Sequence, residues 1–138
     1  MTREELAAAI ERECETFRKE YAVAKKLRAS HPTVSWRLRE AALWELATRK
    51  ELLRRLPTMK PETIQRLKTY VQHQRKKEKQ LRGLSNADLA KGYQQEIWRD
   101  HDLMKAAKAD GIDLRQLSAL LVDGRMKEAP TEPQPQAR

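Results

Sequence analysis

The chain has 138 residues, and its 29 Lys and Arg exceed its 20 Asp and Glu, for a formal charge of +9 at pH 7. This length is typical of one domain, and a hydrophobic content of 39% is enough to form a core. Four Gly and an aromatic content of 5% disfavour an all-β sandwich, a Gly-rich phosphate loop and an aromatic base-stacking sheet. The single Cys excludes an internal disulfide framework and a multi-cysteine zinc site.

No stretch resembles a targeting or membrane-spanning segment. The first residues lack a basic patch followed by an apolar run, and nowhere do roughly eighteen apolar residues follow one another. We therefore expect a cytoplasmic protein with no membrane partner. Abundant Arg and Ala with few Asn and Ile indicate a GC-rich coding sequence, which is typical of many bacteria and their viruses.

Caps and prolines predict the first two helices. Thr2 and Glu5 have the spacing of a capping box, so the first helix is expected to begin at residue 2 or 3. The residue before a proline avoids helical geometry, so Pro32 is expected to end this helix near residue 29. Pro57 predicts the end of the second helix near residue 56.

Three further helices follow. Pro61 fits the first turn of the third helix, with Thr58 or Lys60 as its cap. Gly83 predicts a left-handed stop for that helix. Two more capping boxes, Ser85 with Asp88 and Asp113 with Gln116, predict helices over about 86–109 and 113–122.

These signals define the fold class and the domain. No period-2 alternation of apolar residues persists, so no strand is expected. The sequence predicts an all-α fold, a compact bundle of four long helices and one short C-terminal helix. Residues 1–124 would form a single domain, and residues 125–138, with three Pro and no bulky apolar residue after Met126, would form a disordered tail.

Apolar spacing indicates which helices pack. The second helix carries apolar residues around much more than half of its circumference, so it is either the central helix or one that also makes a dimer interface. On the third helix the apolar stripe of Ile64, Leu67 and Val71 continues with Gln74 and Glu78, so its second half is poorly equipped to pack.

The net charge belongs to one segment. Residues 49–82 hold twelve Lys and Arg against three acidic residues, a balance of +9, while the basic and acidic residues elsewhere cancel. With a short turn, the second and third helices would form one antiparallel basic corner. On the third helix, helical spacing predicts two neighbouring ridges: Lys68, Gln72, Arg75, Lys79 and Arg82 in one, and Arg66, His73 and Lys77 in the other.

Candidate catalytic and metal sites are weak. Cys14 lies beside an apolar stripe and is expected in the core. His101 stands between two Asp, but adjacent helical residues point in different directions, so we expect a boundary or solvated His. No Glu-x-x-His pair, Walker loop or nucleophile elbow occurs. We therefore expect no enzymatic activity, no metal site, no catalytic residue and no cofactor.

The sequence leaves two functions open. The first is a non-catalytic nucleic-acid-binding accessory subunit that grips the phosphate backbone of DNA or RNA within a larger complex or a dimer. No helix-turn-helix, zinc-finger or ribonucleoprotein motif favours base recognition. The predicted contacts are Arg54, Arg55, Arg66, Lys68, Arg75, Lys76, Lys77, Lys79 and Arg82.

The second function is a helical protein-interaction module, such as an adaptor, scaffold or inhibitor, that docks on an acidic partner. Its predicted interface residues are Trp36, Trp44 and Trp98. We expect at least one of them in the core. Trp98 lies off the main apolar stripe of its helix, so it is the one predicted to be partly exposed.

Overall fold

The computed structural model describes the backbone of residues 1–128 and the side chains of residues 1–123. The helices are α1 (Arg3–Lys26), α2 (Pro32–Arg55), the 3-10 helix η1 (Leu56–Thr58), α3 (Pro61–Arg82), α4 (Asn86–Arg99), α5 (His101–Ala109) and α6 (Leu114–Glu128). The described residues contain no strand, which confirms the all-α prediction. Within this range, none of the helices combines the length and apolar character needed to cross a bilayer.

Two of the predicted capping boxes are complete. The Thr2 hydroxyl accepts from the Glu5 N–H at 3.1 Å, and the Glu5 carboxylate accepts from the Thr2 N–H at 3.1 Å. Asp113 and Gln116 exchange the same two bonds at 2.8 and 3.0 Å. Each box satisfies N–H groups that have no partner inside the helix, so α1 and α6 begin where predicted.

The junction between α3 and α4 differs from the prediction. Gly83 ends α3 with φ −86° and ψ −4°, which is right-handed geometry, so the predicted left-handed stop is wrong. Ser85 caps α4 by accepting from the Asp88 N–H at 3.2 Å. The short Asp88 side chain accepts from the Ser85 hydroxyl at 3.0 Å instead of completing the box on the backbone.

The single helix predicted over 86–109 is two helices, α4 and α5. The chain leaves helical geometry at Asp100, with φ −93° and ψ 93°. The Asp100 carboxylate caps α5 by accepting from the Leu103 N–H at 3.0 Å, and it pairs with Arg37 of α2 at 3.1 Å. A tertiary ion pair therefore holds the break, and the local apolar pattern gives no sign of it.

The last helix is longer than predicted. α6 continues to Glu128, past the expected end at residue 122 and into the segment predicted to be disordered from residue 125. The remainder of that predicted tail, 129–138, lies outside the described residues.

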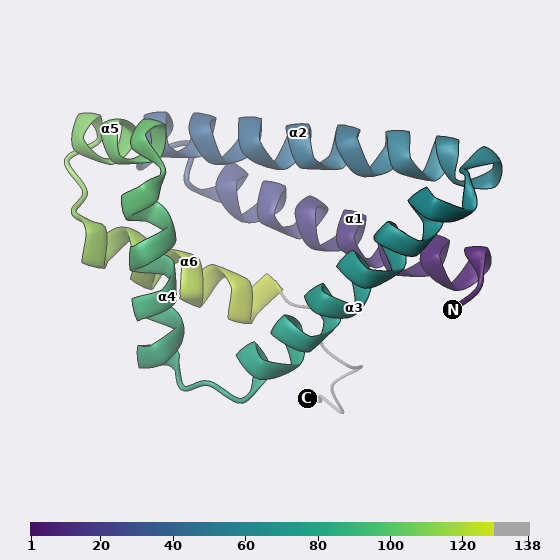
Figure 1. Ribbon diagram of the computed structural model, residues 1–138. Helices are drawn as coiled ribbons and strands as arrows, with labels where there is room; N and C mark the ends of the chain where they lie inside the picture. Colours follow the sequence, from purple (N-terminus) through teal and green to yellow (C-terminus); the bar gives the residue numbers. More distant parts are fainter. Residues whose placement is uncertain (129–138) are drawn as a thin grey trace, which may run out of the picture.

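α1 and α2 pack side by side as an antiparallel hairpin (Figure 1). A hydrophobic cluster lies at each end of this hairpin. The distal cluster joins the start of α2 to α4, α5 and α6 through Val34, Ile97, Leu103, Ala106, Ala107, Ile112 and Leu117. The proximal cluster joins the start of α1 to η1 and α3 through Leu6, Ala9, Leu56, Ile64 and Val71. The Arg3 guanidinium supports the proximal end by donating to the carbonyls of Leu56 and Met59 at 2.6 and 2.9 Å.

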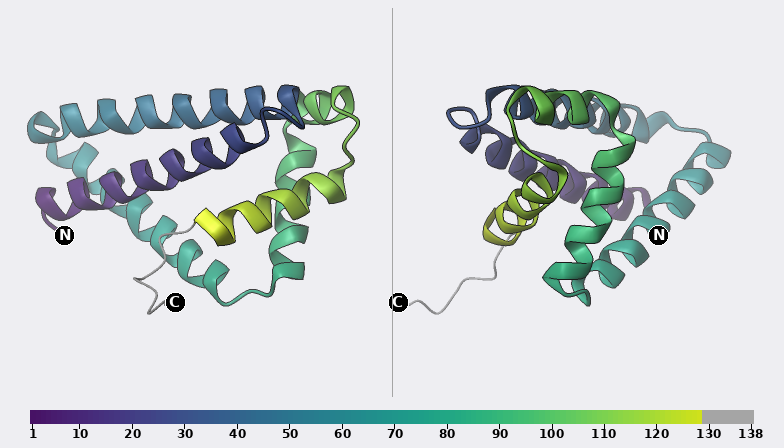
Figure 2. Two further views of the ribbon diagram at one scale, coloured as in Figure 1. Left: turned by 180° about the vertical axis from the view of Figure 1, so that it is seen from behind. Right: turned by 90° about the vertical axis from the view of Figure 1, so that its left-hand side faces the viewer.

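α3 leaves the hairpin at an angle. It descends from the end of α2, packs mainly on α1, and connects to α4, which returns to the distal end of the hairpin (Figures 1 and 2). From residue 72 to residue 88 every side chain except Gln74 is exposed. The predicted lapse of packing after Val71 is confirmed, and α2 and α3 form an open V instead of an antiparallel corner.

Candidate nucleic-acid interface

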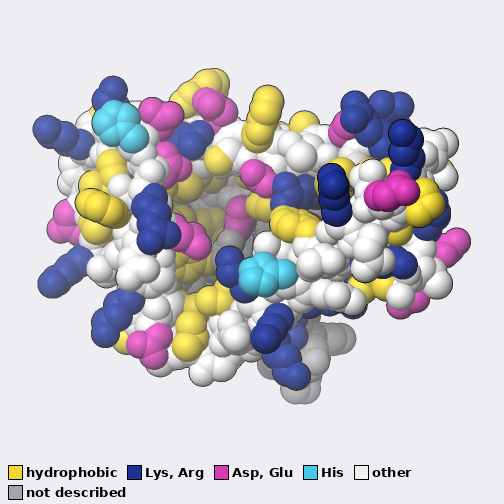
Figure 3. Space-filling model, viewed as in Figure 1, with side chains coloured by type: hydrophobic (Ala, Val, Ile, Leu, Met, Phe, Trp, Pro, Cys, Tyr) yellow, Lys and Arg dark blue, Asp and Glu magenta, His cyan; other side chains and the backbone are white. Residues whose placement is uncertain are grey.

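The nine predicted contact residues lie on α3 and on the last turn of α2. All are exposed except Lys68, which is half-buried beside the packed stripe of α3. Figure 3 shows Lys and Arg side chains along this part of the molecule. The structure thus places the net positive charge on the end of α2 and along α3.

Three of the nine cations are already paired. Glu51 accepts from Arg54 at 2.5 Å and from Arg55 at 2.7 Å, and these hydrogen bonds lower the pKa of the Glu51 carboxyl to about 2. Arg82 pairs with Glu78 at 2.9 Å. A phosphate at these positions would compete with a carboxylate of the protein itself.

The other six cations lie on α3 and form no hydrogen bond or ion pair within the described part of the chain. We call them the α3 cations, and they are Arg66, Lys68, Arg75, Lys76, Lys77 and Lys79. They are solvated ammonium and guanidinium groups available to an anion.

The two ridges of α3 do not lie side by side as predicted. With 3.6 residues per turn, the ridge of Lys68, Arg75 and Lys79 is centred about 160° around the helix axis from the ridge of Arg66, His73 and Lys77. Lys76 lies between them. A ligand that approaches α3 from one side therefore meets one ridge and Lys76, not all six cations.

The first ridge faces the start of α1, and we call it the inner ridge. The pKa of Glu5 is lowered chiefly by hydrogen bonds with Thr2, and Arg75 contributes to the same shift through its charge. The half-buried Lys68 belongs to this ridge as well. The outer ridge, with His73 between Arg66 and Lys77, is wholly exposed.

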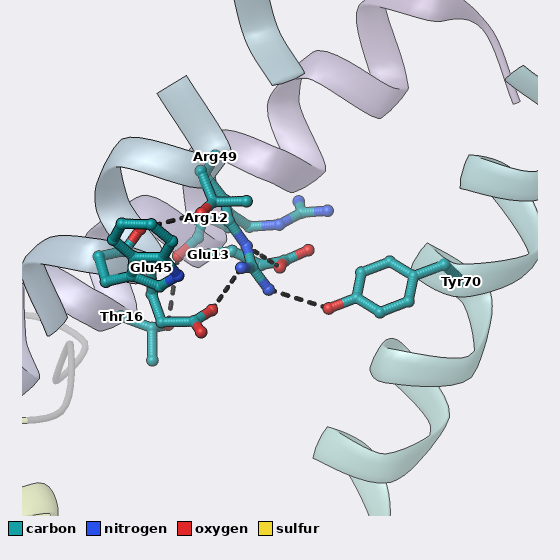
Figure 4. Close-up of polar contacts among 8 residues, drawn as sticks. Arg12, Glu13, Thr16, Glu45, Arg49 and Tyr70 are labelled. Atoms are coloured by element: carbon teal, nitrogen blue, oxygen red, sulfur yellow. Dashed lines mark hydrogen bonds and ion pairs between the residues drawn. The ribbon is translucent and has the colours of Figure 1, made fainter. Parts of the chain in front are cut away.

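Arg49 carries charge in the basic segment but is a structural residue. Its guanidinium pairs with Glu13 of α1 at 3.1 Å and with Glu45, donates to the Tyr70 hydroxyl of α3 at 2.9 Å, and lies 5.0 Å from the centre of the Phe17 ring. Figure 4 shows it reaching from α2 toward both neighbouring helices. With a side chain only 13% exposed, Arg49 joins α1, α2 and α3 and is not available to a ligand.

A hollow of about 370 Å³ lies between α1, α2, α4, α5 and α6, and Figure 3 shows apolar and acidic side chains inside it. Four carboxylates line it, from Glu20, Glu45, Glu96 and Asp100. Burial, together with the charge of Glu96, raises the pKa of Tyr93 in the same wall. Because the lining is acidic, a phosphate backbone is repelled from this hollow and favoured on α3.

All three tryptophans are exposed, so the expectation that one lies in the core is wrong. Trp36 is 62%, Trp44 74% and Trp98 71% exposed. Trp36 and Trp44 line one groove on α2, and Trp98 of α4 is not among the residues of that groove. The predicted exposure of Trp98 is confirmed.

The remaining chemistry is limited. The Cys14 thiol is free and buried in α1, as predicted, and burial raises its pKa, which disfavours the reactive thiolate. Among the side chains that the structure describes, no three His, Cys, Asp or Glu are placed to hold a metal ion.

The sequence alone identifies the cations, but not the residues of the same chain that pair with some of them and make them unavailable to a ligand. The pairing of Arg54 and Arg55 with Glu51 follows helical spacing of three and four residues and was open to prediction. The contacts of Arg49 with α1 and α3 have no signal in the local sequence.

No family model, no curated protein and no solved structure matches this chain.

Proposed function

We propose that the protein is a cytoplasmic, non-catalytic nucleic-acid-binding accessory subunit, a compact helical bundle that contacts phosphate backbones through α3 within a larger nucleoprotein complex. The observation that carries this proposal is the set of six α3 cations without ion pairs. Like charges three and four residues apart on a helix repel by about 0.2–0.5 kcal/mol per pair. A bound polyanion removes that cost and releases its condensed counterions.

The inner ridge is the preferred contact surface. Together with Lys76 it offers four unpaired cations, from Lys68 to Lys79, over about 16 Å of helix. The outer ridge offers two unpaired cations, Arg66 and Lys77, with His73 between them. Contacts of this kind position a protein on the backbone without reading bases, so we expect no sequence preference.

The test is a titration of labelled single-stranded and duplex DNA and RNA at several salt concentrations, followed by fluorescence anisotropy. Four phosphate contacts predict a slope of log affinity against log salt of about −3.6 for duplex DNA and about −2.8 for a single strand. The ranking of the four nucleic acids by affinity then identifies the preferred ligand.

Paired variants locate the contact. Arg75→Gln with Lys79→Gln should reduce the magnitude of the duplex slope by about 1.8, whereas Arg66→Gln with Lys77→Gln should change it little. The matched control is Lys105→Gln with Lys108→Gln on α5, which removes the same charge from another exposed helix. Equal losses in all three variants would mean that net charge alone, and not α3, attracts nucleic acid.

The second candidate is a protein-interaction module that meets an acidic protein. The exposed Trp98 favours it, because a solvent-exposed Trp is a common anchor of protein interfaces. Absence of binding to all four nucleic acids at low salt would favour this candidate. In that case Trp98→Ala should weaken capture of an acidic partner as strongly as neutralisation of Arg75, Lys76 and Lys77.

A further inference from the structure

The outer face of α2 carries an apolar stripe that no other helix of the described chain covers. Trp36, Leu43 and Trp44 are 62%, 52% and 74% exposed, and Ala47 is exposed beside them. Their spacing of seven, eight and eleven residues from Trp36 places them on one side of the helix. Figure 3 shows hydrophobic side chains projecting from the molecule along α2.

This stripe borders a groove. The groove has a volume of about 620 Å³ and is lined by Trp36, Leu43 and Trp44 together with Arg39, Glu40 and Tyr21 of α1. The Arg39 guanidinium lies 5.7 Å from the centre of the Trp36 ring and extends the apolar surface with its own flat face. The stripe and the groove therefore form one surface on the outer side of α2, with the exposed Glu40 between Trp36 and Trp44.

We propose that a second copy of this chain covers the stripe, so that two α2 helices pack antiparallel in a homodimer. The area supports a dimer. A Trp side chain offers up to about 250 Å², so Trp36 and Trp44 alone expose roughly 340 Å². A stable interface buries about 800 Å² per partner, with an apolar centre and a polar rim. The two tryptophans supply up to about two-fifths of that area, and the exposed Leu43 and Ala47 add to it.

The charges on this face favour a second copy over a charged partner. Two cations, Arg37 and Arg39, and two anions, Glu40 and Glu45, line the groove, so the face is neutral in a chain whose +9 lies in residues 49–82. A neutral face offers nothing to a polyanion or to a strongly acidic protein.

The antiparallel arrangement also separates the two basic surfaces. Each α2 ends at Arg55 and leads into α3, so antiparallel pairing of the two α2 helices places the starts of the two α3 helices at opposite ends of the dimer. Their mutual repulsion is then screened by distance. The inference depends on the α2 face alone and holds whichever ligand α3 binds.

The test is the mass of the full chain by light scattering and sedimentation equilibrium at micromolar concentrations, with bound nucleic acid excluded by the ultraviolet absorbance ratio. We expect twice the monomer mass of 16.1 kDa. Trp36→Ala with Trp44→Ala should weaken self-association by at least about tenfold. Trp98→Ala, equally exposed on another helix, is the matched control and should leave it unchanged.

Both mutated side chains are exposed, so the double variant should keep its helical circular dichroism, which verifies folding. Arg75→Gln with Lys79→Gln should roughly halve the salt dependence of duplex binding and leave the dimer intact, which separates this inference from the proposed function. A monomer at every concentration would overturn it. A dimer that the double tryptophan variant does not weaken would overturn it as well.

Discussion

Removing the Asp110 carboxylate tests how α2 begins. Pro32 occupies the first turn of α2, and its N-cap residue, His31, makes no capping bond with its side chain. Asp110, in the turn after α5, takes over this role. Its carboxylate accepts from the Val34 N–H at 2.7 Å and from the Thr33 N–H at 3.2 Å. One side chain from a distant turn thus satisfies two N–H groups that have no partner within α2.

The expected cost follows from these two bonds. Loss of one N-cap acceptor costs about 1 kcal/mol, and up to about 2 in favourable cases. A carboxylate also interacts with the positive end of the helix dipole. We therefore expect Asp110→Ala to lower the free energy of unfolding by about 2 kcal/mol at neutral pH. Asp110→Asn keeps an oxygen acceptor but loses the charge, so it should cost about 1 kcal/mol.

The pH dependence has a definite sign. Burial opposes ionisation, but the hydrogen bonds from Val34 and Thr33 outweigh it and lower the pKa of Asp110 below its ordinary value of 3.8. A carboxyl whose pKa is lower in the folded state stabilises the protein above its unfolded pKa, and this contribution is lost as the pH falls through the folded pKa. The difference between the parent and Asp110→Ala should therefore persist at neutral pH and shrink below 3.8.

The assay is urea denaturation followed by circular dichroism, at neutral and acidic pH. In a thermal scan each kcal/mol should correspond to about 4 °C in a domain of this length. Glu11→Ala on α1 removes one exposed carboxylate and is the control, with an expected change within about 0.5 kcal/mol. If Asp110→Ala also stays within that range, or if its cost is the same on both sides of the titration, the capping explanation is wrong.

The same urea assay compares two pairs of variants, one pair at arginines and one at glycines. Arg49→Met should cost about 3 kcal/mol because it leaves the Glu13 carboxylate, 22% exposed, without its ion-pair partner and removes the bond to Tyr70. The exposed Arg54→Met should change stability by less than about 1 kcal/mol. Equal costs would contradict the assigned roles. Gly111 has φ +68°, so Gly111→Ala should cost about 1–2 kcal/mol. Gly92 lies in the middle of α4, where an added Cβ meets nothing within 4 Å. Gly92→Ala should therefore raise the free energy of unfolding by about 0.5–1 kcal/mol. In an NMR titration, Glu51 should have a midpoint near 2 that returns toward 4.5 when both arginine partners are replaced by Gln.

Local chemistry made several helix boundaries predictable, namely those set by capping boxes and prolines. The capping bonds of Thr2 and Asp113 involve residues only three positions away, so they form wherever the helix starts. Pro32 and Pro57 act through their own rings and likewise need no tertiary partner. The end of the apolar stripe after Val71 was predictable for the same reason, because it depends only on which residues share one face of α3.

Features that depend on distant residues were not predictable. The break at Asp100 is held by Arg37, 63 residues earlier, and the cap of α2 comes from Asp110, 76 residues later. The α3 cations were identifiable from composition, but Arg49 was not separable from them because its partners lie on α1 and α3. The prediction that the two ridges of α3 are neighbours did not need the structure to correct it, since helical spacing alone places them about 160° apart.

The two hydrophobic clusters have a consequence for how this chain can diverge. Neither cluster is a continuous segment, because each draws on one end of the α1–α2 hairpin and on helices that come later in the sequence. Only the proximal cluster includes residues of α3, and it uses the side of that helix that the outer ridge does not occupy. Mutations that add, remove or reverse charge on α3 therefore require no compensating change in the distal cluster. Natural selection can change the charge of α3 to suit a new ligand while the residues of the distal cluster stay the same.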